Sequence, residues 1–533
     1  MSSAALPADA APKRDADAPP ERAADAPPER ADLGAWLAVA AGSLGALMAT
    51  LDISIVNSAL PVIQGEIGAS GTEGTWIATS YLVAEIIIIP LAAWLERVLG
   101  LRTFLLIASI LFTGFSVVCG LSTSLGMMIV GRAGQGITGG ALVPTAMTII
   151  ATRLPRSQQP IGTALFGVTA ILGPVLGPLI GGYLTENVSW HYAFFLNVPV
   201  GAVLLLLLLV GLPHQKAHLE ELKKADWLGI AGLALGLGGL TVVLEEGQRE
   251  QWFQSALIIK LTALTVLGLV MLIAGQFVAK NPVVKLRLLL DRQFGSVVTM
   301  GLVLGMMLYG SSYVIPQFLA AIADYNALQS GKVVLLSGIP SLLMMPLVPI
   351  MIRHLDIRLA VASGLLLMAM SCHLDTTLTA DSVGSAFTDS QLLRGVGTVL
   401  GFVFLNQAAI ASVKPSEAGD AAGLFSAARN IGGSFALAGI ATLQDQRSYL
   451  HARRIDETLN ANSIDLQSYL AATGRALGDP AAALRALGGT IQREALVMTY
   501  NDLFWLLSVG ICCVVPLVLF LRPLPQGKMA AMH

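Results

Sequence analysis

Long apolar runs separated by short polar turns follow one another along almost the whole chain. A helix of about 20 mainly apolar residues is long enough to cross a bilayer. The pattern therefore predicts an all-α polytopic membrane protein with about fourteen transmembrane helices. The predicted spans are residues 34–62, 75–95, 103–122, 125–152, 161–184, 192–212, 227–245, 256–278, 295–322, 333–352, 358–378, 391–413, 422–444 and 502–522.

The composition supports a membrane protein and indicates no cofactor. Of the 533 residues, 55% are hydrophobic and 12% are charged, and the net charge is −2. The mean hydropathy is +0.71. The charged share is about half of that in soluble domains, and no basic tract suggests nucleic acid. No phosphate loop, metal-ligand cluster or nucleophile–base pair is visible, so we expect a non-enzymatic protein without metal or cofactor.

The chain divides into two bundles, an insert and two tails. Residues 1–32 are polar and rich in Ala and Pro, with DAPPER at 17–22 and again at 25–30, and predict a disordered tail. We expect six-helix bundles at 33–212 and 295–524, with two extra transmembrane helices in a linker at 213–294. Residues 525–533 form a second tail.

The Lys and Arg residues indicate the orientation. The short loops at 96–102, 153–156, 214–224, 280–292 and 353–358 each carry at least two of them. The alternate loops near 64–73, 185–190, 323–331 and 379–389 carry none. Basic loops mark the cytoplasmic side, so both termini are predicted to be cytoplasmic.

The last non-cytoplasmic segment, residues 445–501, is long and mixed in charge. Its arginines lie among residues that favour helices: Arg453, Arg454, Arg475, Arg485 and Arg493. We expect a small helical element outside the membrane. It either joins two spans as a solvated loop or offers a docking surface to a partner.

The fourth and twelfth spans repeat one pattern. GRAGQGITGGALVPTAMTIIATRLP opens with Arg132 and ends near Pro155, and LRGVGTVLGFVFLNQAAIASVKP opens with Arg394 and ends at Pro415. Two halves of six spans, with spans seven and eight inserted between them, explain this offset. Parallel repeats of this kind are typical of transporters whose halves rock about a central site.

The fifth span is unusually rich in glycine and proline. Gly173, Gly177, Gly181 and Gly182 share a helical stripe, and Pro178 lies beside them. Such residues destabilise helices in water, but in lipid they let two helix backbones approach closely. We expect this stripe to be a contact on which the two halves pivot.

Charged residues inside the spans are the candidates for energy coupling. Asp52, Glu85, Arg132 and Arg429 all lie within apolar runs. Each costs at least about 2.5–3.5 kcal/mol at the centre of a bilayer, so such residues mark function. A carboxyl exposed in turn to two compartments and to an arginine could load and release a proton. A static Asp52–Arg132 ion pair that holds two helices in register is the alternative.

The motifs resemble those of a known family, the fourteen-span drug:proton antiporters of the major facilitator superfamily, in particular EmrB- and QacA-like permeases. The resemblance extends from about residue 34 to 522. Similar segments occur at residues 51–61 of the first span, 132–136 of the fourth, 173–182 of the fifth and 195–201 of the sixth. The fifth-span segment is of the kind found in exporters.

This resemblance implies export of hydrophobic or amphipathic compounds in exchange for protons by alternating access. It implies proton coupling by Asp52, Glu85 and Arg132. We assign the substrate cavity to Asn57, Gln135, Asn406 and Arg429, and the helix pivot to Gly173, Gly177, Pro178, Gly181 and Gly182. A dedicated exporter of one endogenous metabolite, such as a fatty acid, siderophore or antibiotic, is the alternative.

The resemblance also implies partners and a location. EmrB-like permeases work in the inner membrane with a periplasmic adaptor and an outer-membrane channel, so a tripartite system is expected, with residues 445–501 at a position suited to the adaptor. One loop departs from the family pattern Gly-x-Leu-x-Asp-Arg-x-Gly. Arg97 takes the place of the aspartate and Glu96 precedes it, which puts the usual cytoplasmic latch in question.

Overall fold

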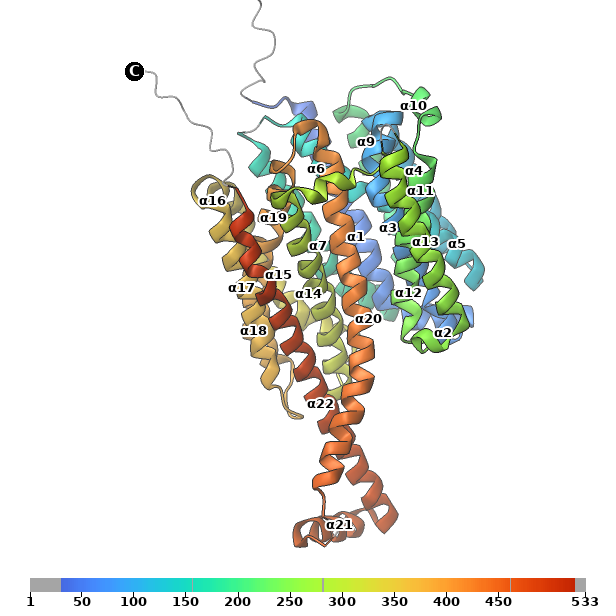
Figure 1. The fold of residues 1–533 in the computed structure, drawn as a ribbon. Coiled ribbons are helices and arrows are strands. Elements are labelled where there is room, and N and C mark those ends of the chain that lie inside the picture. The colour runs from blue at the N-terminus through green and yellow to red at the C-terminus, as the bar shows by residue number, and fades with distance from the viewer. Residues whose placement is uncertain (1–29, 156, 280–281, 461, 523–533) are drawn as a thin grey trace, which may run out of the picture.

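The computed structural model describes residues 30–155, 157–279, 282–460 and 462–522. In this part of the chain every regular element is a helix, and most helices run side by side in one elongated bundle (Figure 1). Among the described residues, eleven helices or helix runs are long and apolar enough to cross a membrane. Three further stretches, α3, the broken run α5–α6, and α20, lie among them. They would complete the predicted fourteen spans, a count that stays a prediction.

The N-terminal bundle begins where Asp32 caps the first helix. Its side chain accepts a hydrogen bond from the backbone N–H of Ala35 at 2.9 Å, a usual way to satisfy a free helix N–H. The helices are α1 (Leu33–Ile67), α2 (Gly71–Gly74), α3 (Trp76–Leu99), α4 (Leu101–Gly120), α5 (Leu125–Gly139), α6 (Leu142–Arg153), α7 (Gln159–Asn187), α8 (His191–Phe195) and α9 (Asn197–Gly211).

The inserted segment forms its own helix pair. It comprises α10 (Glu220–Lys223), α11 (Trp227–Leu233), the π-helical η1 (Ala234–Gly238), α12 (Gly239–Gly247), η2 (Trp252–Gln254) and α13 (Ala256–Val278). Gly236 and Gly268 let the two arms touch, since a Cβ on Gly268 would lie 2.3 Å from the backbone nitrogen of Gly236. The pair packs against α3 of one bundle and α20 of the other.

The C-terminal bundle repeats the arrangement. Its elements are η3 (Leu286–Leu290), α14 (Arg292–Ile322), α15 (Ala327–Met344), η4 (Met345–Leu347), α16 (Val348–His354), α17 (Ile357–Leu374), η5 (Asp375–Thr377), η6 (Gly384–Phe387), α18 (Thr388–Thr398), η7 (Val399–Val403), α19 (Phe404–Ala411), η8 (Pro415–Glu417), α20 (Ala418–Thr458), α22 (Pro480–Val514) and η9 (Val515–Phe520). The two bundles meet where α7 packs on α15 and where α3 and α6 pack on α20.

Two C-terminal helices extend beyond the bundle. Together with α21 (Ile464–Leu477), the ends of α20 and α22 form an element that projects from one end of the molecule, whereas α10 lies at the opposite end (Figure 1). The segment 445–501 is therefore largely helical. The tails at 1–29 and 523–533, which include the predicted second tail, lie outside the described residues.

Candidate functional site

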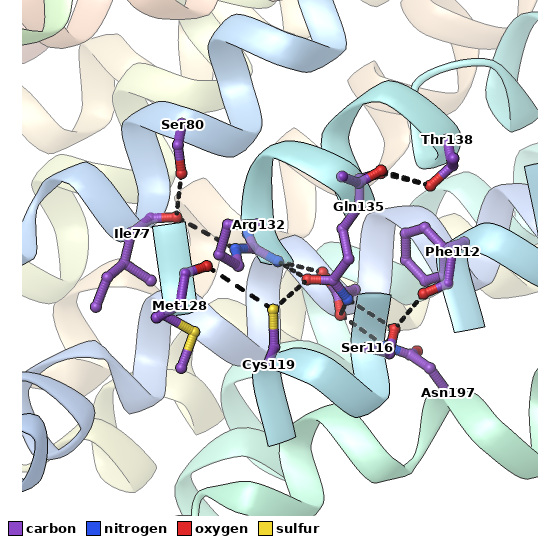
Figure 2. A network of polar contacts seen from close by, with 12 residues as sticks. Ile77, Ser80, Phe112, Ser116, Cys119, Met128, Arg132, Gln135, Thr138 and Asn197 are labelled. Carbon is purple, nitrogen blue, oxygen red and sulfur yellow. Dashed lines mark hydrogen bonds and ion pairs between the residues drawn. The ribbon is translucent and has the colours of Figure 1, made fainter. Parts of the chain in front are cut away.

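The carboxylate of Asp52 is the centre of a buried polar network in the N-terminal bundle. Arg132 donates from Nη1 to Oδ2 at 2.5 Å, while Gln135 Nε2 and Asn197 Nδ2 donate to Oδ1 at 3.0 and 2.7 Å. Figure 2 shows the side chains of Arg132 and Gln135, both on α5, and of Asn197 on α9 close together. All four side chains are buried. Asp52 thus ties α1 to α5 and α9, and the predicted partnership with Arg132 is present.

The guanidinium of Arg132 is held on several sides. It also donates to Gln135 Oε1 at 2.9 Å and to the carbonyl of Ile77 at 3.2 Å. Its Cζ lies 4.3 Å from the centre of the Tyr81 ring, a cation–π contact. The arginine would therefore keep partners if Asp52 lost its charge. Such an arrangement can tolerate both protonation states of the acid.

Every polar group that Asp52 contacts is a donor. An ionised carboxylate only accepts hydrogen bonds, so the network as built fits the charged form. A proton on Asp52 would remove the attraction to Arg132 and turn one acceptor into a donor. Because α1, α5 and α9 are joined through this carboxylate, protonation would loosen their contact.

The sequence did not single out Asn197 and Ser116 as site residues. Ser116 on α4 accepts from Gln135 Nε2 at 2.7 Å and from Asn197 Nδ2 at 3.2 Å, so it supports both amides that hold Asp52. Asn197 begins α9, whose remaining residues are apolar or glycine apart from Pro199. A polar side chain in such a run was the available signal.

A second group of polar residues lies between the bundles. The buried Glu85 of α3 interacts with the guanidinium of Arg429 and the amide of Asn430, both on α20. The hydroxyl of Tyr309 on α14 donates to Asn430 Oδ1 at 3.3 Å. Arg429 also lies over the ring of Phe402 at 5.3 Å. The structure therefore brings Glu85 and Arg429 together, at the junction of the two halves.

The other predicted cavity residues are dispersed. Asn57 on α1 is exposed. Asn406 is buried and donates within its own helix to the carbonyl of Phe402 at 3.2 Å. Gln135 belongs to the Asp52 network. Of the four assigned residues, only Arg429 lies beside Glu85 between the bundles.

The glycine stripe of α7 packs against α1, in the same bundle. Its glycines face small polar residues one turn apart: Gly173 faces Thr50, Gly177 faces Ser54 and Gly181 faces Ser58. A Cβ on Gly177 would lie 2.2 Å from Cβ of Ser54, so only glycine permits this approach. Gly182 has no atom within 4 Å of its Cβ position and does not share this role.

A hydrogen bond made possible by Pro178 adds to the contact between α7 and α1. Pro178 has no N–H, so the carbonyl of Pro174 loses its usual partner four residues on. The hydroxyl of Ser54 donates to that carbonyl at 3.3 Å and replaces the missing bond. The contact with the other bundle uses a different face of α7, where Pro178 lies against Gly331 and Val175 against Gly338 of α15. Our expectation that the glycines themselves face the other half is thus corrected, because their stripe is used for close packing inside one bundle.

Ion pairs join the halves at the end predicted to be cytoplasmic. Arg97 of α3, at the departure from the family pattern, lies 3.1 Å from the buried carboxylate of Asp420 at the start of α20. Lys285 of the linker lies 2.8 Å from Asp420 and 3.5 Å from Glu417, and Arg287 lies 2.9 Å from Glu417. We call these five residues the basic–acidic clasp. The altered loop therefore still makes a charged contact between the bundles.

Glu417 of the clasp remains charged over a wide pH range. Burial by itself would raise the pKa of Glu417, but the hydrogen bond from Arg287 and the charge of Lys285 outweigh it and lower that pKa below its ordinary value. Glu417 is thus ionised near neutral pH.

Two adjacent acids fasten the inserted helices to both bundles. Glu246 is 3% exposed and lies 2.7 Å from Arg249, with Oε1 accepting from Thr79 of α3 at 3.4 Å. Glu245 accepts from Ser434 of α20 at 3.0 Å. The buried Glu246 and the partly buried Glu245 thus bind opposite sides of the junction.

Comparisons with known proteins agree with this architecture. The sequence model of the Major Facilitator Superfamily matches residues 42–437. The chain is 32% identical over 480 residues to the colistin resistance protein EmrB of Acinetobacter baumannii, spanning 89% of this chain and 94% of that protein. It is 31% identical over 487 residues to the multidrug export protein EmrB of Escherichia coli, spanning 90% and 94%. The fold is similar to the human organic anion transporter MFSD10 (TETRAN), with a TM-score of 0.58, 16% identity and coverage of 90% and 99%.

Proposed function

The chain belongs to the Major Facilitator Superfamily of membrane transporters, and we propose that it exports hydrophobic or amphipathic compounds in exchange for protons by alternating access. It is a multi-pass membrane protein acting on small molecules. Export is supported by the relatives named multidrug export and colistin resistance proteins. The observation that carries the coupling is the buried Asp52 network.

The proton step begins with Asp52 ionised and held by Arg132, Gln135 and Asn197. Burying an acid disfavours its charged form, whereas a nearby arginine favours it, so a small change in their separation shifts the balance. When the acid takes up a proton on Oδ2, α1 loses its ionic contact with Arg132 of α5, while Oδ1 can still accept from Gln135 and Asn197. Arg132 keeps its contacts with Ile77 and Tyr81. Loss of the charge on Asp52 weakens its ion pair with Arg132, and this starts the movement of α1.

Movement of α1 carries α7 with it. The two helices are packed backbone to backbone along the glycine stripe, so a shift of Asp52 reaches Pro178 and Val175, which contact α15 of the other half. The pivot we propose is therefore this pair of helices moving as one unit. The close packing along the glycine stripe makes α7 move with α1. The two halves then tilt against each other at the contact between α7 and α15.

The substrate would bind between the halves, beside Glu85, Arg429 and Tyr309. A carboxylate and an aromatic hydroxyl suit an amphipathic cation, and the apolar surroundings suit its hydrophobic part. Because Glu85 comes from one half and Arg429 from the other, an occupant here would contact both. This placement lets binding depend on how the halves are tilted.

We further propose an inner-membrane location with both termini cytoplasmic, and a tripartite assembly with a periplasmic adaptor and an outer-membrane channel. The projecting element formed by α21 and the ends of α20 and α22 would contact the adaptor. Replacing residues 459–479 by a short flexible linker should abolish co-purification with the adaptor while transport in proteoliposomes is retained. Unchanged co-purification would exclude this surface.

The function is tested with purified protein in proteoliposomes that contain a pH-sensitive dye. A hydrophobic cationic dye should move against an imposed proton gradient, and its addition should drive protons the opposite way. Asp52→Asn should strongly reduce both movements, while the matched control Asp324→Asn, at an exposed loop position, should keep them. Dye movement without proton movement, or in the same direction, would contradict proton-coupled export.

A further inference from the structure

A second buried ion pair lies in the C-terminal bundle, and the proposed function does not use it. Arg394 of α18 donates from Nη2 to Oδ2 of Asp375, in the turn η5, at 3.1 Å. The two side chains are 7% and 1% exposed. A buried ion pair is costly to form, so its position calls for a reason.

The pair occupies the place in its half that Arg132 has in the other. Arg132 and Arg394 lie near the start of the fourth helix of their bundles, and each interacts with a fully buried cysteine of the third helix, Cys119 or Cys372. Both bundles also place a buried glutamine three positions from the arginine. The repeat seen in the sequence thus extends to the chemistry of the two centres.

The Asp52 network and the Asp375–Arg394 pair differ in how many of their polar atoms have a hydrogen-bond partner. Both oxygens of Asp52 accept hydrogen bonds. Within the part of the chain that the structure describes, Oδ1 of Asp375, Nε of Arg394 and both amide atoms of Gln391 have no hydrogen-bond partner. These three residues, taken whole, are no more than 5% exposed. Buried polar atoms are nearly always satisfied, by ordered water where the protein offers no partner.

These four atoms without partners could be satisfied by a small ligand that both donates and accepts hydrogen bonds. Two of them accept, Oδ1 of Asp375 and Oε1 of Gln391, and two donate, Nε2 of Gln391 and Nε of Arg394. Water can serve both kinds at once. A proton that reaches Asp375 through such water would be shared between the free carboxylate oxygen and the water.

The site lies near the face from which α21 projects. Asp375 ends the third helix of its bundle, and the loop that follows, with Asp381 and Arg493, lines a polar hollow of about 270 Å³ at that face. In the described residues, Arg394 and Cys372 are the ionisable groups that face Asp375. Asp502 of the neighbouring α22 is instead paired with Arg447 and His451. Arg394 is therefore the positive charge that acts on Asp375, and the hydroxyl of Ser390 interacts with the same carboxyl group.

We infer that Asp375, Arg394 and Gln391 form a second, hydrated proton-binding site, so that the transporter exchanges two protons for each substrate molecule. This inference rests on the proposed proton-coupled export. It assigns one proton to each half of the molecule. The acid of the first half comes from α1 and that of the second from the end of α17.

The number of protons is measured from the substrate ratio at which net flux stops. In proteoliposomes with the membrane potential clamped to zero, one pH unit balances a substrate ratio of about tenfold for one proton and about a hundredfold for two. We expect about a hundredfold for the wild type and about tenfold for Asp375→Asn. Asp375→Glu and the exposed control Asp381→Asn should stay near a hundredfold.

The outcomes separate this inference from the proposed function. A wild-type ratio of about tenfold that Asp375→Asn leaves unchanged would overturn the second site and keep proton exchange. Absence of any proton-driven balance in the wild type would overturn the proposed function itself. If Asp375→Asn does not fold, Gln391→Leu removes the water contacts and leaves the ion pair. It should move the pH of half-maximal transport by about one unit, and an unchanged pH profile would overturn the hydrated site.

Discussion

Arg97 and Asp420 form an ion pair of 3.1 Å that joins α3 of the N-terminal bundle to α20 of the C-terminal bundle. The arginine side chain is 46% exposed and the aspartate 2%. Asp420 also binds Lys285 of the linker, at 2.8 Å. A single buried carboxylate therefore holds three segments of the chain together at one end of the molecule.

Because Arg97 is exposed and Asp420 is buried with two basic partners, we expect replacement of Asp420 to have a larger effect than replacement of Arg97. Exposed ion pairs contribute at most about 1 kcal/mol, so Arg97→Gln should loosen this end only slightly. Asp420→Asn leaves Arg97 without its acid and Lys285 with Glu417 alone, and should shift the population clearly toward a form open at this end. Distances between spin labels on cysteines placed at Ser157 and Ser416 measure that population, after Cys512 and Cys513 are replaced by serine. Equal effects of the two substitutions would contradict the clasp as described.

The glycine stripe predicts a steric test inside the N-terminal bundle. Gly177→Ala would place a Cβ 2.2 Å from that of Ser54, and such overpacking costs about 1–3 kcal/mol. We expect a lower unfolding temperature and slower transport. Gly182→Ala, where the Cβ meets open space, is the matched control and should behave as the wild type.

The same contact allows a rescue. Ser54→Gly removes the atoms that the new methyl group would strike, so the double variant Ser54→Gly/Gly177→Ala should recover most of the lost stability. If the double variant is no more stable than Gly177→Ala alone, close packing of α1 on α7 is not the reason for the glycines. Thermal unfolding of the purified proteins decides between these results.

The carboxylate of Glu85 between the bundles leads us to expect that the transporter prefers positively charged substrates. Glu85→Gln removes the carboxylate between the bundles and keeps its shape, so export of a cationic dye should fall by about tenfold, a loss of roughly 1.4 kcal/mol of interaction. Export of a neutral compound of similar size should change little. Equal loss for both compounds would indicate that Glu85 serves the proton or the fold rather than substrate charge.

We expect Glu417 to contribute no pH dependence to transport between about pH 5 and 8. The pKa of Glu417 lies below its ordinary value because Arg287 and Lys285 favour the carboxylate over the cost of its burial. A carboxylate with a lowered pKa contributes its stability above the ordinary value, near 4.3, and loses it only as the pH falls through the lowered pKa. Glu417→Gln should therefore leave the shape of the pH–transport profile unchanged. A shifted profile would show that the clasp takes part in proton coupling.

The helices were predictable from the sequence because a membrane span is a local property. Apolar length located the span at 161–184, and α7 runs from Gln159 to Asn187. The broken helices were not visible, since the π-helical turns η1 and η7 depend on packing with neighbours. The predicted spans 422–444 and 502–522 also missed how far α20 and α22 extend beyond the bundle.

The candidate site was only partly predictable. Charge inside a span must find a partner, and this rule paired Asp52 with Arg132. Asn197 lies 145 positions from Asp52, and its neutral amide gave no comparable signal. Asp420 lies 323 positions from Arg97, so only the tertiary fold shows that the altered loop has an acidic partner. Which distant helices become neighbours is decided by packing that a single sequence does not display.

The most direct test of the account is substrate exchange by Asp52→Asn, because asparagine resembles the protonated, uncharged form of the acid. In proteoliposomes without a proton gradient, the variant should still exchange labelled for unlabelled substrate. When a pH gradient is imposed, the same variant should accumulate clearly less substrate than the wild type, because the proton carried by Asp52 is lost. Accumulation driven by the pH gradient at the wild-type level would contradict the claim that the Asp52–Arg132 pair couples protons to transport.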